Sequence, residues 1–373
     1  MWLHDGSGAS TNAQGEFILP SPASFPDTLV IYYIGYQNDT NVFLQAPTAP
    51  LQISLKEGVA LDELEISEKV RATQLSTLTP NLVETIGGKE LEKAACCNVS
   101  ESFETNASVD LAATDAVSGS KKIRMLGLDG VYSSLLLENI PWMTGLQAST
   151  AFNKVPGSWV DGIQISKGAG SVVNGYSSLT GQINLQLLAP DEVEERVFIN
   201  LYGNTMGRGE ANVHLNQRFS EKWSSLLLLH ASGMQQKNDI NDDLFLDAPL
   251  RESYQVLNRW KYKGERLRAQ FGVQAYQESM QAGQTSFEKS QDINTLNAYG
   301  VGNTDRQLTF FAKSGLLYPA CEGRSLAVQV LGSWYEHDGY YGLRNYIGEQ
   351  YHGSAKFIWQ ESIGTDNRQK LTS

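Results

Sequence analysis

The carboxyl half of the chain repeats one pattern that restricts its fold more than any other feature of the sequence. In "RLRAQFGVQAY", Leu267, Ala269, Phe271, Val273 and Ala275 alternate with residues that are mostly polar or charged. Successive side chains of a β-strand point to opposite faces. The pattern therefore predicts a strand with one apolar face and one polar face.

Seven further segments show the same alternation, with lapses. The eight predicted strands cover 196–203, 211–219, 223–232, 254–263, 266–276, 307–318, 325–336 and 351–359. Several approach the length of about 9 to 11 residues that a tilted strand needs to cross a bilayer.

The connections between these strands follow an order. Short links ("SEK", "GE" and "PACEGR") alternate with long polar stretches from Gly233, from Glu278 to Arg306 and from His337 to Gln350. Tight turns at one end and long loops at the other are typical of outer-membrane β-barrels. A soluble β-sandwich explains the alternation but not this order, so the pattern favours a membrane barrel.

Aromatic residues near the strand ends favour the same fold, because such residues gather at both membrane interfaces. They are Tyr202, Trp223, Trp260, Tyr262, Tyr318, Trp334, Tyr335 and Trp359.

The length of 373 residues predicts two or three domains. A net charge of −12, with Lys and Arg scattered, argues against nucleic acid as a partner. No apolar stretch reaches the roughly 18 to 20 residues of a membrane helix. The amino terminus lacks the basic and apolar regions of a signal peptide.

The sequence contains no catalytic constellation. Its five histidines are far apart, and it has no GxSxG, HExxH or Walker motif. We therefore expect neither an enzyme nor a cofactor.

Several segments resemble the plug and first barrel strands of TonB-dependent outer-membrane receptors. They are "IRMLGLDG", "LLLENIPW", "VDGIQISKGAGSVVNGYSSLTGQINLQL" and the strands that follow, and the resemblance covers about residues 75–373. It implies a globular plug inside a barrel of about 22 strands. The expected fold is β-rich, with a partial amino-terminal β-sandwich, a small α/β plug and about eight strands of a large antiparallel transmembrane β-barrel.

Four domains are expected from this resemblance. Residues 1–57 resemble a carboxypeptidase-regulatory-like β-sandwich of Bacteroidetes receptors without its first two strands, 58–74 form a linker, 75–190 the plug, and 191–373 an incomplete barrel. The linker resembles one that carries a TonB box, for which Leu64, Glu65, Ile66 and Ser67 are the candidates. Such a box pairs with a TonB strand by β-augmentation. An ordinary acidic linker is the alternative.

The plug residues expected to contact ligand are Tyr132, Trp142, Met143, Asn153, Lys154 and Trp159. The alternative is that they pack the plug against the barrel. Gly168 and Gly170 are expected to permit a tight turn, and Gly175 and Gly181 to let the backbone bend where side chains would meet the barrel wall.

Cys96 and Cys97 are adjacent in "AACCNVSESFETN". Thiolates select soft metals such as Cu(I), so a metal contact is one hypothesis for this pair. The alternative is that they are small packing residues, since a disulfide between neighbours is strained.

The resemblance implies active import across the bacterial outer membrane, with TonB and outer-membrane lipid as partners. The ligand would be a small molecule or metal complex, such as a siderophore, haem, cobalamin or copper chelate. Two alternatives stay open: a glycan or peptide importer paired with a surface lipoprotein, and a binding or adhesion protein without transport. Because an eight-stranded barrel could not hold a plug, we expect a fragment whose sheet is open and curved around the plug.

Overall fold

The structure is a computed structural model of the chain. It describes residues 2–3, 7–9, 11–12, 15–31, 39–47, 50–54, 73–76, 83–87, 99, 103, 109–113, 117–119, 121–148, 150–168, 178–318, 324–362 and 370–372. The chain divides into two compact units, Met1–Val70 and Arg71–Ser373.

The first unit contains the antiparallel strands β1 (Asp27–Ile31) and β2 (Asp39–Phe43). Trp2 forms a bridge with Leu29 of β1, and both side chains are buried. The Trp2 ring packs edge-on against Phe25 and Phe43. Trp2 and Leu29 thus form a small apolar centre beside a two-stranded ribbon.

The second unit begins with a mixed domain, here called the inner domain (residues 73–187). Its strands are β3 (Thr73–Ser76), β4 (Val83–Gly87), β5 (Val109–Ala113), β6 (Lys121–Met125), β7 (Leu128–Asp129), β8 (Ser133–Leu137), β9 (Ile140–Pro141), β10 (Val160–Lys167) and β11 (Gly181–Leu187). Its described helices are single 3₁₀ turns: η2 (Gly130–Tyr132), η3 (Gly145–Gln147), η4 (Ala151–Lys154) and η5 (Gly157–Trp159).

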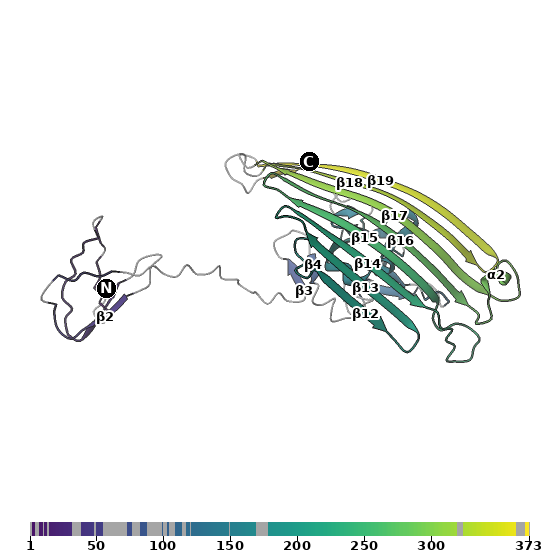
Figure 1. Cartoon of the computed structure of the whole chain (residues 1–373), viewed down its shortest axis with the longest axis horizontal. Coiled ribbons are helices and arrows are strands. Elements are labelled where there is room, and N and C mark those ends of the chain that lie inside the picture. The colour runs from purple at the N-terminus through teal and green to yellow at the C-terminus, as the bar shows by residue number, and fades with distance from the viewer. Residues whose placement is uncertain are drawn as a thin grey trace. The chain divides into compact units, whose positions relative to one another are not determined.

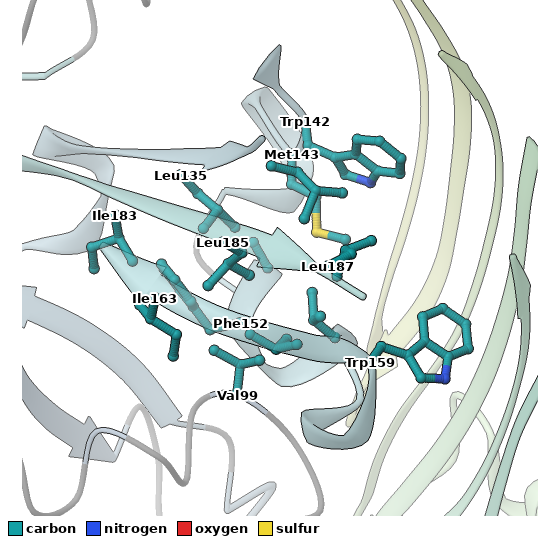
Figure 2. Close-up of a cluster of buried hydrophobic side chains, with 14 of the residues drawn as sticks. Val99, Leu135, Trp142, Met143, Phe152, Trp159, Ile163, Ile183, Leu185 and Leu187 are labelled. Atoms are coloured by element: carbon teal, nitrogen blue, oxygen red, sulfur yellow. The ribbon is translucent and has the colours of Figure 1, made fainter. Parts of the chain in front are cut away.

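The inner domain is built on a six-stranded sheet with the order β3-β4-β10-β11-β8-β9. The pair β11 and β8 is parallel and the other pairs are antiparallel. Alternate residues of β10 and β11 fill its core, where Ile163, Ile165, Ile183 and Leu185 are almost completely buried. Figure 2 shows Ile163, Ile183 and Leu185 together in this core, as the sequence predicts for these strands.

A large antiparallel sheet follows, and Figure 1 shows it as a curved wall. Its strands are β12 (Val197–Gly203), β13 (Arg208–Arg218), β14 (Trp223–Met234), β15 (Leu250–Lys263), β16 (Leu267–Gly283), β17 (Gly300–Leu317), β18 (Ser325–Tyr341), β19 (Arg344–Ser362) and β20 (Lys370–Thr372). A short helix α2 (Lys289–Asp292) lies between β16 and β17. The strand order is linear from β12 to β20, so the described sheet is open.

Two ends of this sheet are distinguished below. The turn end carries the short connections 219–222, 264–266 and 318–324, and the loop end carries the longer connections 235–249 and 284–299. One expected long loop is absent: residues 337–350 mostly continue β18 and β19, which are joined by a tight turn at Gly342 and Leu343. The polar composition of this stretch led to the prediction of a loop. Its strands are paired through their backbones and show no apolar alternation that would have indicated them.

The two faces of the sheet are chemically opposite. On β16, Phe271 and Val273 are exposed, whereas Gln274 and Tyr276 are buried. The outer face of the sheet is thus apolar, and the inner face, which contacts the inner domain, is largely polar. The apolar run from Leu267 to Ala275 covers about 27 Å along the strand, enough for the apolar band of a tilted membrane strand.

Aromatic side chains mark both borders of the outer face. Trp223 packs against Tyr262, and Tyr318 against Trp359, at the turn end. At the other border, Trp334 and Tyr351 both donate to Glu349. Tyr335, expected in this group, is instead 2 % exposed, because it lies one residue from Trp334 and points inward.

Among the described residues, no helix combines the length and apolarity needed to span a membrane.

Candidate functional site: the contact between the inner domain and the sheet

The inner domain and the sheet share one apolar cluster. Leu226, Leu228 and Phe311 from the inner face belong to the same buried group as the core of the inner domain. Trp142 stacks at a tilt on Phe311, with ring centroids 5.3 Å apart. Figure 2 shows Trp142 and Trp159 pointing from the inner domain toward the strands of the sheet. The polar contacts around this cluster occur in four places.

The first polar contact is the tight turn between β8 and β9. Its two residues, Glu138 and Asn139, have φ angles of 50° and 65°. Two positive φ values are those of a type I′ turn, which favours Asn or Gly and makes Glu138 an unusual choice. The turn presents the Glu138 carboxylate to the inner face of the sheet.

Three side chains of the sheet bind the Glu138 carboxylate. Oε1 accepts from Arg259 Nη2 at 2.6 Å, and Oε2 accepts from Gln270 Nε2 at 2.9 Å and from Lys313 Nζ at 2.5 Å. Burial alone would raise the pKa of Glu138, but Arg259 and Lys313 outweigh it and lower the pKa from 4.5 to about 2. Glu138 is therefore ionised at neutral pH and tied to the wall.

The second contact follows β11, in the segment Leu188–Val193, here called the exit segment. Arg259 Nη1 donates to the Leu188 carbonyl at 2.9 Å. Lys261 Nζ lies 2.5 Å from Asp191 Oδ1, and Arg218 donates to the Asp191 carbonyl. The exit segment is thus fixed to β13 and β15 as the chain leaves the inner domain.

These contacts reveal a row of cations on the inner face at the turn end. The cation row consists of Arg218, Lys261, Lys313 and Lys356, which lie at one height on β13, β15, β17 and β19. Ser224, Gln270 and Gln329 occupy the same height on the strands between. Every cation of the row contacts the Glu138–Asn139 turn or the exit segment, since Lys356 donates to the Asn139 carbonyl.

The third contact lies nearer the loop end and has the opposite polarity. Lys154, the last residue of η4, is 3 % exposed. Its Nζ lies 2.9 Å from Asp305 Oδ2 and donates to the Tyr335 hydroxyl at 3.0 Å. His337 Nδ1 lies 2.6 Å from the other oxygen of Asp305. A buried ammonium of the inner domain is therefore held by an anion of the wall.

The fourth contact joins η3 and the preceding residue Thr144 to β19. Gln350 accepts from the Leu146 N–H at 2.8 Å and donates to the Thr144 carbonyl at 3.0 Å. Gly145 has φ +62° and would place a Cβ against the Gln350 amide, so only glycine fits there.

The expected ligand-contact residues divide by exposure. Trp142, Met143, Lys154 and Trp159 are buried. Asn153 is half-buried and donates to the Lys121 carbonyl at 3.1 Å. Tyr132 alone among the six is exposed, at 47 %.

Tyr132 belongs to a larger exposed surface, here called the apolar patch, formed by Leu126, Leu128, Val131, Tyr132 and Leu179. The Tyr132 carbonyl accepts from the N–H groups of Leu179 and Thr180, which holds the two halves of the patch together. An exposed patch of large apolar side chains indicates a place where another apolar surface binds.

Several expected site residues fall outside the described residues: Leu64, Glu65, Ile66, Ser67, Cys96, Cys97, Gly170 and Gly175. Gly168 directly follows β10 with φ +87°. A Cβ on Gly181 would meet Met125 and Ser166, so its close neighbours belong to the inner domain and not to the wall. No group of three or more His, Cys, Asp or Glu suited to a metal ion occurs in the described part of the chain.

Sequence reasoning missed Glu138, Arg259, Lys313 and Asp305. The available signal was the inward position of Arg259, Lys261 and Lys313 on otherwise regular strands. Charged side chains facing the interior of a barrel need a partner there.

Comparison with known proteins agrees with this architecture. Residues 77–182 match the family model described as TonB-dependent Receptor Plug Domain. No curated protein sequence matches the chain.

Solved structures with the same fold share little sequence. They include the siderophore receptor PiuA from Acinetobacter baumannii (TM-score 0.56, 11% identity, covering 77% of this chain and 43% of PiuA). The FpvAI–pyocin S2 complex gives a TM-score of 0.61 at 12% identity, covering 79% of this chain and 40% of the other. BauA, the ferric preacinetobactin receptor from Acinetobacter baumannii, gives 0.55 at 14% identity, covering 77% and 45%.

This chain therefore spans less than half the length of the structures it matches. The inner domain corresponds to the matched plug region, and the large sheet is the part of the fold that surrounds it. Residues 77–182 thus match the plug domain of TonB-dependent receptors, and about three quarters of the chain has the fold shared by these solved receptor structures.

Proposed function

We propose that this chain is part of a receptor that imports a scarce metal chelate across the outer membrane of a bacterium, with energy supplied through TonB. The observation that carries the proposal is a plug domain seated on the polar inner face of a sheet whose outer face is apolar. PiuA, which shares this fold, is a siderophore receptor, and BauA, which also shares it, is the ferric preacinetobactin receptor. The proposed partners are TonB, outer-membrane lipid and the chelate itself.

The contacts between the plug and the sheet suit a domain that must move. Glu138, Asp191 and Lys154 are tied by ion pairs, and the exit segment by donors to its carbonyls. When these polar contacts break, water can take the place of the lost hydrogen-bond partners. Separating an interface made only of apolar side chains would instead lose the free energy gained by burying them. This chemistry supports displacement of the plug during import.

The apolar patch around Tyr132 is the proposed ligand surface of the plug. It consists of five large apolar side chains that are exposed on this domain, and Tyr132 adds a hydroxyl to it. A tyrosine offers a large contact area at low cost in conformational entropy. The proposed chelate therefore presents an apolar or aromatic part to the plug.

The test is growth of a deletion strain on a panel of iron, copper and cobalamin sources, with complementation by the intact gene. The proposal predicts a defect on at least one metal source that complementation restores. Normal growth and uptake on every source would contradict metal import.

A second experiment locates the ligand surface once a source is found. Tyr132→Ala should weaken binding of that compound about tenfold, the scale of a binding hot spot. Tyr254→Ala is the matched control, because Tyr254 is also exposed but lies on the outer face of the sheet. Equal loss in both variants would contradict the assignment.

A further inference from the structure

A cavity of about 400 Å³ lies at the turn end of the inner face, between the exit segment and strands β15 to β18. Four cations line it: Lys261, Lys263, Arg268 and Lys313. Asp191 and Glu192 line its opposite side, and Gln270 and Gln329 contribute amide groups.

Only two of the four cations are neutralised. Lys261 pairs with Asp191 and Lys313 with Glu138, each at 2.5 Å. Lys263 and Arg268 are directly opposed partners on β15 and β16. Among the described residues, neither of their side chains makes an ion pair or hydrogen bond. Like charges directly opposite each other are unfavourable in a sheet, so this position favours an anion.

The surrounding wall has the same sign. Seven inward cations lie at the turn end (Arg218, Arg259, Lys261, Lys263, Arg268, Lys313 and Lys356), against four nearby carboxylates of the chain (Glu138, Asp161, Asp191 and Glu192). Along β17 the next inward acid is Asp305, eight residues from Lys313, and it is already paired with Lys154. Two carboxylates of the exit segment also line this cavity, but the cations outnumber them, and a concave site with an excess of one sign of charge concentrates ions of the other sign.

We infer that this turn-end cavity binds a carboxylate or phosphate group of the imported ligand as the ligand leaves between the plug and the sheet. The inference rests on the proposed function and adds the substrate class, an anionic chelate. When the plug moves, Glu138 and Asp191 leave Lys313 and Lys261, and an anionic ligand takes their place. In the docked state, Lys263 and Arg268 already offer two charges to such a group.

The test measures binding of citrate and of pyrophosphate to the full chain in detergent. Calorimetry at low and high salt gives the affinity for each probe. The variant Lys263→Gln with Arg268→Gln removes the two unpaired charges. The matched control, Lys222→Gln with Arg266→Gln, removes two charges from the same end outside the cavity lining. A second variant, Lys263→Arg with Arg268→Lys, keeps both charges and guards against a folding defect.

We expect the wild type, the control and the charge-keeping variant to bind both probes, more weakly at high salt. The Lys263→Gln, Arg268→Gln variant should bind at least tenfold more weakly. Absence of binding to the wild type, or equal weakening in the control, would overturn the inference.

The growth panel separates this result from the proposed function. Normal growth on every source would contradict the proposal of metal import. The citrate-binding measurement would still test whether the cavity binds anions. Import of a ligand that carries no carboxylate or phosphate would overturn the inference and leave the proposed function in place.

Discussion

Lys154 of the plug and Asp305 of the sheet form an ion pair of 2.9 Å in which both side chains are at most 6 % exposed. Eight residues away on the same strand, about 27 Å along β17, Lys313 binds Glu138 of the plug. The plug thus meets the sheet with an anion at the turn end and a cation toward the loop end. A reversed plug would bring like charges together, so this pattern fixes its orientation.

Glu138→Gln should loosen the docked plug. The substitution leaves Arg259, which is 1 % exposed, without its carboxylate, and breaking a buried ion pair costs about 3 kcal/mol or more. Urea-induced release of the plug, followed by the fluorescence of Trp142 and Trp159, measures the loss. Glu192→Gln is the control: Glu192 is 67 % exposed, and its pair with Lys261 should contribute at most about 1 kcal/mol. Similar losses of stability in both variants would argue against a buried ion pair at Glu138 that stabilises the docked plug.

Acid should release the plug through the same carboxyl group. The pKa of Glu138 falls from 4.5 to about 2 in the fold, so its stabilisation is complete above pH 4.5 and is lost as the pH falls toward 2. A shift of this size corresponds to about 3 kcal/mol. Urea titrations between pH 2 and 6 should show this loss in the wild type and a flatter profile in Glu138→Gln. Parallel profiles would mean that other carboxyl groups control acid release.

Lys154→Met should also destabilise the docked plug, since Asp305 would remain buried with only His337 and the Tyr335 hydroxyl as partners and no cation of the plug beside it. The expected loss is about 3 kcal/mol. Adding Asp305→Asn removes the unpaired charge and should recover part of it, so a double-mutant cycle should give a coupling well above about 0.5 kcal/mol. Strictly additive effects would show that the two residues act independently.

Much of the fold is predictable from local pattern. Alternation places the strand from Leu267 to Tyr276 and identifies its apolar face, because the face that contacts the plug is largely polar and the opposite, exposed face is apolar. The alternation of apolar and polar residues fades toward the loop end of β18 and β19. Tyr340 of that hairpin is buried and stacks on Phe287, which is distant in sequence, so nothing local reveals the contact and the stretch was predicted as a loop.

The site is less predictable than the fold. Glu138 and Lys313 are separated by 175 residues, and nothing local to "LLLENIP" reveals which cation it meets. Lys313 lies level with Lys261 because both residues pair with Gln270 on the strand between them. The sequence alone does not give this register of strand pairing. Tyr132 was expected to contact ligand, and the structure shows only that its ring is 47 % exposed.

The energy-coupling segment is predicted at Leu64–Ser67, an extended, proline-free stretch before the plug. Glu65→Pro removes a backbone N–H and should prevent pairing with a TonB strand. Ligand uptake should fall to the level of a strain without TonB, while binding to whole cells stays at the wild-type level. Glu65→Ala keeps the N–H and should transport normally. Unchanged uptake by Glu65→Pro would sink the assignment.

A soft-metal contact is one hypothesis for the adjacent thiols Cys96 and Cys97, and packing is the other. Under the metal hypothesis, the full chain should bind Cu(I) in competition with a chelator, and Cys96→Ser with Cys97→Ser should abolish that binding, because a hydroxyl does not replace a thiolate for this ion. Exposed thiols also scavenge copper, so Cys321→Ser provides the control: it removes the remaining cysteine of the chain and should leave the affinity unchanged. Equal Cu(I) affinity in the double variant would assign Cys96 and Cys97 to packing. Loss in Cys321→Ser alone would place the copper contact at that thiol instead.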